Sequence, residues 1–318
     1  MRTIFALGVV GNHCRTLLIG TGQARPLPFP WVLAFIALSG WLVTQSMESS
    51  NSYAHFLWKR ILRVVPGFLL SIAVVAVIAG LQAVSPTLIC WATFGVGRRG
   101  ESANPVLWSL SVEEVLYVLL ALGFAINVFT TGRRSLAALA VGASVISVIL
   151  PLENPYMTAA LQPPIVFLFA VAFYRYRSAI PWNAWVAALC LLTISLAMHF
   201  VPDVLNLKGA LLPFSAALVY GVIGLGLYAK PLLARFESIG DPSYGIYILH
   251  YPVLLYIWQL GLHSLYLYPV ALLAAVMMGL LSYHLLERHA LKFKNSLFEA
   301  TSPGAEAHLE GALTTGPT

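Results

Sequence analysis

Residues 61–84 read ILRVVPGFLLSIAVVAVIAGLQAV, a run in which Arg63 is the single charged residue. A helix needs about 20 predominantly apolar residues to cross the hydrocarbon core of a membrane. Nine more runs of this kind follow one another along the chain, at 3–20, 31–47, 106–129, 135–151, 159–174, 182–201, 210–228, 243–262 and 264–286. The sequence therefore predicts an all-α, polytopic membrane protein with a bundle of about ten transmembrane helices.

The composition excludes several other classes of protein. Of the 318 residues, 59% are hydrophobic and only 9% are charged, whereas a soluble domain carries about 25% charged residues. The three cysteines, Cys14, Cys90 and Cys190, are too scattered for a disulfide framework or a zinc site, and we expect no metal. The basic residues are dispersed among apolar runs, which indicates loops on an anionic membrane surface rather than nucleic-acid binding.

Lysine and arginine are distributed unevenly between the two sets of loops. Most lie on the side that holds both chain ends, whereas the opposite loops hold only Arg25, Arg98, Arg99 and Lys208. The positive-inside rule then predicts that both termini are cytoplasmic. We expect residues 1–300 to form one transmembrane domain and residues 301–318 to form a disordered tail.

Ionisable residues inside a membrane span are unfavourable unless they are paired or hydrated, so each is a functional candidate. Arg2 and His13 are eleven residues apart in the first span, which is about three helical turns and places them on nearly the same face. A helix anchor and a structural histidine are the simpler alternative. His250 in the ninth span, within the segment SYGIYILHYP at 243–252, is a second candidate for the same cavity or for a structural role.

The segment WSLSVEE at 108–114 opens the fourth span. Ser109, Glu113 and Tyr117 follow one another at intervals of four residues and form one polar stripe, while Glu114 is turned away by about 100 degrees. We expect Glu113 to meet His13 at a similar depth, because a carboxylate that orients an imidazole makes it a general base. A structural glutamate bonded between helices is the alternative.

Lys59, Arg60 and Arg63 begin the third span, and the two arginines are three residues apart. A pair of guanidinium groups on one helix face suits the oxygens of a phosphate. Ordinary positive-inside charge or lipid headgroup contact explains them equally well. The segment Leu38-Ser39-Gly40 in the second span is interpreted as a site of close helix packing.

In their order and depth, these segments resemble the acyltransferase 3 family, ten-helix bacterial membrane proteins that O-acylate envelope sugars. The resemblance extends from Arg2 to about Arg288. It implies that His13 is the catalytic histidine with Arg2 as its partner, and that Glu113 matches the first glutamate of the Trp-Ser-Leu motif. It also implies that Arg60 and Arg63 contribute to the acyl-donor site. Val115 and Leu116 depart from the family pattern, which more usually has Gln-Phe there.

The resemblance further implies transfer of an acyl group, most simply acetyl, from acyl-coenzyme A to a hydroxyl group of an envelope carbohydrate, in the bacterial inner membrane. Acyl-coenzyme A would be a co-substrate rather than a permanently bound cofactor. We assign substrate binding to polar and aromatic residues of the motif segments, namely Trp108, Ser109, Ser111, Glu114, Tyr117, Tyr244 and His250. A transporter or flippase of lipid-linked sugars and a catalytically idle relative are the alternatives.

Overall fold

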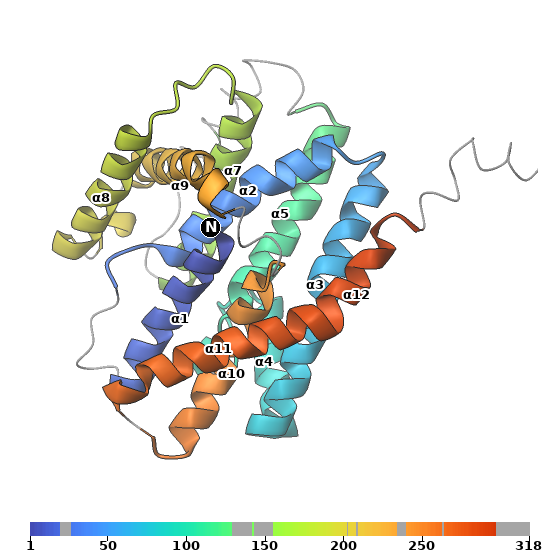
Figure 1. Cartoon of the computed structure of the whole chain (residues 1–318), viewed down its shortest axis with the longest axis vertical. Helices are drawn as coiled ribbons and strands as arrows, with labels where there is room; N and C mark the ends of the chain where they lie inside the picture. Colours follow the sequence, from blue (N-terminus) through green and yellow to red (C-terminus); the bar gives the residue numbers. More distant parts are fainter. Residues whose placement is uncertain are drawn as a thin grey trace, which may run out of the picture.

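The computed structural model describes residues 1–19, 27–128, 142, 155–201, 203–207, 209–233, 240–262 and 264–296. These residues form helices joined by short turns and contain no β-strand (Figure 1). The helices are α1 (Arg2–Ile19), α2 (Trp31–Glu48), α3 (Tyr53–Ala79), α4 (Val84–Ala92), α5 (Leu107–Ala125), α7 (Pro155–Arg175), α8 (Ala184–Phe200), α9 (Leu211–Leu233), α10 (Ser243–Gln259), α11 (Tyr268–Ser282) and α12 (Arg288–Ala290). The predicted all-α class is confirmed.

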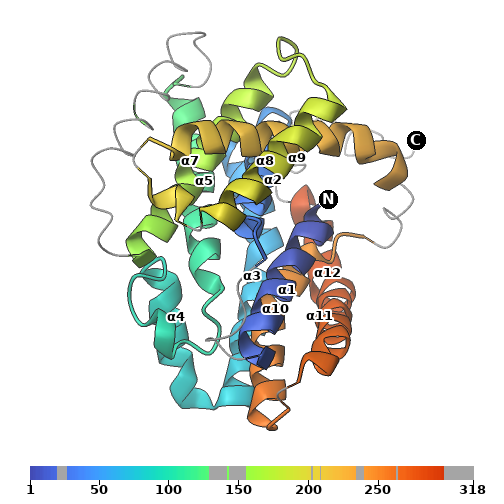
Figure 2. The same ribbon diagram turned by 90° about the vertical axis from the view of Figure 1, so that its left-hand side faces the viewer.

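The helices arrange themselves in two groups with two helices between them. Figures 1 and 2 show α7, α8 and α9 together on one side and α1, α3, α10 and α11 on the other. Helix α2 packs against α7, α9 and α1, and α5 packs against α4, α7 and α3. A continuous apolar core runs through both groups and includes residues of α1, α2, α5 and α10. The central helices therefore position the polar residues that the sequence analysis singled out.

Among the residues that the structure describes, four helices are long and apolar enough to cross a membrane, at Tyr53–Ala79, Leu107–Ala125, Leu211–Ala229 and Tyr268–Lys294. Large apolar side chains such as Val77 and Trp185 are 84% and 85% exposed, as expected for surfaces that face lipid rather than water. The chain is therefore an all-α membrane protein. The count of ten spans stays a prediction, because the structure describes only residue 142 of the fifth run at 135–151. The predicted tail at 301–318 lies outside the described residues.

Most helix boundaries agree with the predicted spans, and α3 shows why one does not. It begins at Tyr53, eight residues before the apolar run, because the hydroxyl of Ser52 accepts a hydrogen bond from the backbone N–H of His55 and caps the helix. The helix ends before Gly80, whose φ of +84° suits a residue without a side chain. The short helix α4 follows and was not predicted.

Two glycines allow α10 and α11 to lie in close contact. A side-chain carbon on Gly279 would lie 2.7 Å from the backbone nitrogen of Ile246, and one on Gly245 would lie 3.0 Å from the Cα atom of Gly279. Small residues at such a crossing let two membrane helices approach backbone to backbone. This contact fixes the position of α10 and, with it, the position of His250.

Helix α10 also contains a proline whose effect is compensated by side chains from other elements. Pro252 has no N–H group, so the carbonyl of Ile248, four residues earlier, loses its helical partner. The side-chain amide of Asn104 donates a 2.8 Å hydrogen bond to this carbonyl, and the hydroxyl of Ser71 lies 3.4 Å from it. The freed carbonyl is thereby satisfied inside the membrane domain, as a buried backbone group requires.

Candidate active site

Two histidines from different helices form a hydrogen-bonded pair. Nδ1 of His13 in α1 lies 2.8 Å from Nε2 of His250 in α10, and the two rings stack with their centroids 5.1 Å apart. The ring of Tyr251 stands edge-on to His13 at 5.3 Å. His250 is completely buried, so its ring is held in one place. The candidate site is therefore built around an imidazole pair.

The hydrogen bonds of His250 assign the tautomer of both rings. Nδ1 of His250 lies 2.7 Å from the carbonyl oxygen of Tyr247 and 3.2 Å from that of Ile246. A carbonyl oxygen only accepts, so Nδ1 of neutral His250 carries the proton and Nε2 is an acceptor. Nδ1 of His13 must then be the donor, which leaves Nε2 of His13 without a proton. An imidazole nitrogen in this state is able to accept a proton from a substrate.

The structure corrects the predicted pairing of His13 with Glu113. The carboxylate of Glu113 accepts a hydrogen bond from the hydroxyl of Ser39 in α2, and this hydroxyl also lies 3.3 Å from that of Tyr117. The two helices that carry the predicted partners share α2 as a neighbour but otherwise pack on different helices, α10 and α11 for α1 and α4, α7 and α3 for α5. Helical rise predicts how far along its own helix a residue lies, but not which residue of another helix faces it. His250, and not Glu113, is the partner of His13.

The three residues of the predicted polar stripe of α5 are buried in the structure. Ser109, Glu113 and Tyr117 are all less than 9% exposed. The hydroxyl of Ser109 lies 2.5 Å from that of Tyr247 in α10. The stripe thus joins α5 to α2 and α10.

Arg2 and Arg63 meet at one acid. Asp241, directly before α10, lies 3.3 Å from the guanidinium of Arg2 and 2.6 Å from that of Arg63. Glu287, completely buried in the π turn Tyr283–Glu287, lies 3.8 Å from Arg63. Burial acts to raise the pKa of Asp241, but the charges of Arg63 and Arg2 outweigh it and lower that pKa to about 2. Asp241 therefore stays ionised and holds both arginines.

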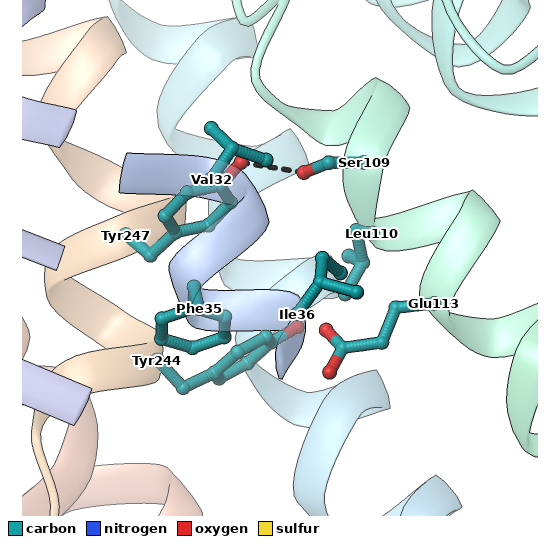
Figure 3. Close-up of a pocket in the computed structure, with 8 residues that line it drawn as sticks. All are labelled: Val32, Phe35, Ile36, Ser109, Leu110, Glu113, Tyr244 and Tyr247. Carbon is teal, nitrogen blue, oxygen red and sulfur yellow. Dashed lines mark hydrogen bonds between the residues drawn. The ribbon is translucent and has the colours of Figure 1, made fainter. Parts of the chain in front are cut away.

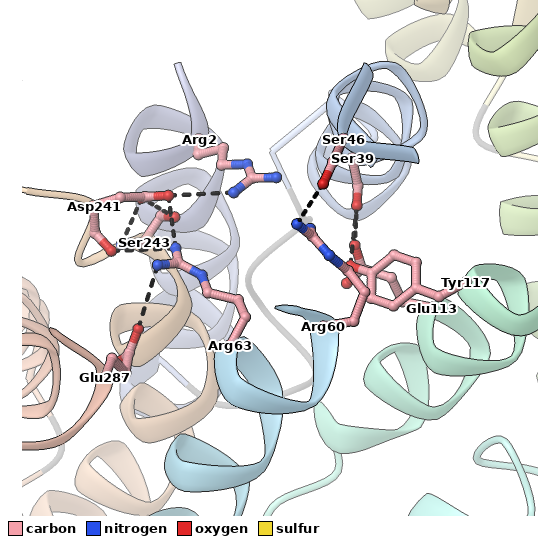
Figure 4. Close-up of polar contacts among 10 residues, drawn as sticks. All are labelled: Arg2, Ser39, Ser46, Arg60, Arg63, Glu113, Tyr117, Asp241, Ser243 and Glu287. Carbon is pink, nitrogen blue, oxygen red and sulfur yellow. Dashed lines mark hydrogen bonds and ion pairs between the residues drawn. The ribbon is translucent and has the colours of Figure 1, made fainter. Parts of the chain in front are cut away.

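Arg60 belongs to a second group, so in the structure the two arginines of the predicted fork have different partners. Arg60 donates a 3.1 Å hydrogen bond to the hydroxyl of Ser46 and lies over the ring of Tyr117 at 5.9 Å. Three residues leave the two side chains only about 60 degrees apart around the helix, but each long guanidinium reaches oxygen atoms on a different neighbour, Ser46 for Arg60 and Asp241 for Arg63. Figure 4 draws both groups, in which the guanidinium of Arg2 points toward that of Arg60. We call this region, defined by Arg2, Arg60 and Arg63, the arginine end.

A small pocket lies between the Glu113 group and α10 (Figure 3). Its volume is about 10 Å³, which is about that of one water-sized probe. It is lined by Val32, Phe35, Ile36, Ser109, Leu110, Glu113, Tyr244 and Tyr247. In Figure 3 the carboxylate of Glu113 and the ring of Tyr244 border the same narrow space.

A larger pocket lies beside His13 and has a volume of about 220 Å³. It is lined by Val9, Asn12, His13, Phe29, Pro30, Trp31, Val32, Leu33, Gln162, Met198 and Leu205. Val32 also lines the small pocket, so the two pockets adjoin at this side chain. We call this larger cavity the histidine pocket.

Five of the seven predicted substrate-binding residues line neither pocket. Tyr117 belongs to the Glu113 group and His250 to the histidine pair, whereas Trp108, Ser111 and Glu114 belong to neither. The ring of Trp108 is covered by the guanidinium of Arg99 at 4.5 Å. The hydroxyl of Ser111 donates to the carbonyl of Trp108 in its own helix, and Glu114 is half-buried away from the stripe. Neither their contacts nor the pocket linings bring these three residues to His13.

Sequence reasoning missed four residues of the site. Asp241 stands immediately before the ninth predicted span, and an acid at a span end in a chain with few acids was a usable signal. Ser39 was interpreted as a packing residue, yet its hydroxyl binds Glu113. Trp31 and Gln162 line the histidine pocket, and nothing in their local sequence distinguishes them from other residues of apolar spans.

The comparisons with known proteins identify the family. A family model described as an acyltransferase domain, that of the acyltransferase 3 family, matches residues 1–285. The chain is 26% identical to Nodulation protein 10 of Rhizobium leguminosarum bv. viciae, over 84% of this chain and 83% of that protein. No solved structure matches the chain significantly. Since the match covers most of the sequence and includes the histidine pair and the arginine end, the chain belongs to the acyltransferase 3 family.

Proposed function

We propose that this acyltransferase transfers an acyl group, most simply acetyl, from acyl-coenzyme A to a hydroxyl group of an envelope carbohydrate. The observation that supports this proposal is the hydrogen bond between His13 and His250, which leaves Nε2 of His13 unprotonated in a residue that lines a pocket. A general base needs this state and this access.

The donor approaches from the arginine end. Arg2 and Arg60 each have a buried Nε atom without a hydrogen-bond partner, and their guanidinium groups point toward one another. The phosphates of coenzyme A would supply oxygen acceptors for these two Nε donors, while Arg2 keeps its ion pair with Asp241. Coenzyme A is a cytoplasmic compound, so this end faces the cytoplasm, in agreement with the expected orientation. Arg63 already contacts two carboxylates, those of Asp241 and Glu287. Its role would then be to hold Asp241 in position.

The chemistry follows from the free nitrogen of His13. Nε2 takes the proton of the carbohydrate hydroxyl as its oxygen attacks the thioester carbonyl carbon. The carbon–sulfur bond breaks, and the leaving thiolate receives the proton back from the imidazole. The products are a carbohydrate ester and the free thiol of coenzyme A. A route through an acylated residue is chemically open as well.

Glu113 takes a different role from the one the sequence predicted. Its carboxylate lies in the small pocket, which adjoins the histidine pocket at Val32. We propose that Glu113 lines the route by which the thioester reaches His13. Ser39 and Tyr117 would hold its carboxylate in place. The remaining predicted substrate-binding residues, Tyr244 and Ser109, line the same narrow section.

The test is transfer of label from [14C]acetyl-coenzyme A to envelope glycan in membranes that contain the protein. We expect wild-type membranes to label one glycan fraction and His13→Gln to reduce the rate about 10²- to 10⁴-fold, the usual contribution of a general base. His199→Gln is the control, because His199 is exposed near the end of α8. Retained transfer in His13→Gln would remove His13 from the mechanism. Absence of label in every wild-type glycan fraction would contradict acetyl transfer and favour a transporter.

A further inference from the structure

We infer that the histidine pocket binds a neutral, hydroxyl-bearing ring of the acceptor, with the indole of Trp31 and the amide of Gln162 as its recognition groups. This inference rests on the proposed function and assigns the acceptor subsite within it. None of the sequence motifs pointed to these two residues. The subsite is instead defined by the composition of the pocket wall, the fixed aromatic rings and one unsatisfied donor.

The described wall of the histidine pocket contains aromatic and amide side chains and no Asp, Glu, Lys or Arg. A phosphate or a carboxylate in an apolar pocket needs a basic partner. A neutral ring with several hydroxyl groups instead needs aromatic faces for its C–H groups and a few polar groups that fix its orientation. The pocket chemistry therefore fits an uncharged sugar ring.

Trp31 is packed tightly into this wall. Its indole lies directly against Gly8 of α1, where an added side-chain carbon would lie only 2.1 Å from the ring. The ring of Phe29 also contacts it, with the centroids 4.6 Å apart and the planes tilted by 56°. Helix α1 thus carries both the proposed base, His13, and Gly8, which leaves room for the indole of Trp31.

The polar groups of the wall have hydrogen-bonding capacity to offer a ligand. Nε1 of Trp31 is buried and donates to no acceptor in the described structure. Buried donors normally have partners, and an unpaired one calls for an explanation. The side-chain oxygen of Asn12 accepts a 2.7 Å hydrogen bond from the backbone N–H of Leu27, which holds its amide on the same wall. Because Nε1 has no exposed surface in this structure, a small turn of the indole would bring this donor to a hydroxyl oxygen of the acceptor.

The position of the pocket fits transfer as well as binding. His13 lines it together with Trp31 and Gln162, and the pocket adjoins the narrower one of Glu113 at Val32. Donor and acceptor would then reach the imidazole from different sides. A ring in the histidine pocket places a hydroxyl group beside the base without crossing the donor route.

The test separates the Michaelis constants of the two substrates. Purified protein in lipid nanodiscs is assayed with [14C]acetyl-coenzyme A and glycan extracted from the host envelope, each varied in turn. Trp31→Phe keeps an aromatic ring and removes the N–H group, while Gln162→Leu removes the amide. We expect each to raise the KM for the glycan about 3- to 10-fold, the usual effect of losing one hydrogen bond to a neutral group, with an unchanged KM for acetyl-coenzyme A.

Two controls make the result specific. Trp185→Phe changes an exposed tryptophan of α8 and should leave both constants unchanged, and melting temperatures in nanodiscs show whether Trp31→Phe is folded. An unchanged KM for the glycan in both pocket variants, or a changed KM for acetyl-coenzyme A instead, would overturn the acceptor subsite. Transfer by the wild type would still support the proposed function in that case. Preference for longer acyl donors in the pocket variants would likewise overturn it and assign the pocket to the acyl chain. Absence of transfer by the wild type would overturn both proposals.

Discussion

Replacement of His250 tests the tautomer assignment directly. In the wild type, Nδ1 of His13 lies 2.8 Å from Nε2 of His250. His250→Leu keeps a side chain of similar volume but removes this acceptor. A buried donor left unpaired costs about 1–3 kcal/mol, and His13 is then free to move its proton to Nε2, where it no longer acts as a base. About 1.4 kcal/mol corresponds to a tenfold change in rate, so a loss of about 1–3 kcal/mol predicts that kcat falls about 5- to 150-fold.

The conservative variant separates this role from a merely structural one. In His250→Gln the side-chain oxygen replaces Nε2 as the acceptor, so we expect most of the lost kcat to return. Acetyl transfer is measured at saturating glycan, and the KM for acetyl-coenzyme A should stay unchanged because the proposed donor contacts are at the arginine end. Equal kcat values in the Leu and Gln variants, at equal melting temperatures, would refute the assignment. His199→Leu is the matched control on the exposed face of α8.

Three other residues give predictions for stability, each measured by thermal unfolding in detergent or nanodiscs. Asn104→Leu should destabilise the protein by about 1–3 kcal/mol because the carbonyl of Ile248 loses its donor, and adding Pro252→Ala should recover part of that loss; no recovery would contradict the account of the kink. Gly279→Ala should destabilise by about 1–3 kcal/mol, since the added carbon meets the backbone of α10; a wild-type melting temperature would contradict the close contact. The pKa of Asp241 is lowered from 3.8 to about 2, so its ion pairs stabilise the fold fully above pH 4 and are lost as the pH falls toward 2. The difference in melting temperature between wild type and Asp241→Asn should therefore be constant from pH 8 to pH 5, and a difference that disappears within this range would disprove the ion-pair assignment.

The helices could be predicted because apolar run length is itself the physical constraint on a membrane helix. The predicted spans at 31–47 and 243–262 begin at the same residues as α2 and α10. The start of α3 could not be found in this way, since its first two turns contain Lys59 and Arg60 and are stabilised by the Ser52 cap rather than by apolar character.

The site was predicted in part, for a reason that its residues make clear. The predicted alignment of Arg2 with His13 on one face of α1 agrees with their contacts, since Arg2 meets Asp241 and His13 meets His250. Helical periodicity fixes which residues share a face. It does not fix which helix packs on that face, so the carboxylate of Glu113 was assigned to His13 while its actual partner is Ser39.

The two departures from the family pattern acquire a different meaning in the structure. Val115 is exposed on the outer surface of α5, and Leu116 is buried in the apolar core. Neither lines the small pocket or the histidine pocket. A glutamine at position 115 would therefore face away from the proposed chemistry, and an aromatic residue at position 116 would act on core packing. The sequence argument for a catalytically idle relative depended on a missing polar group at the site, and the position of these side chains removes that argument.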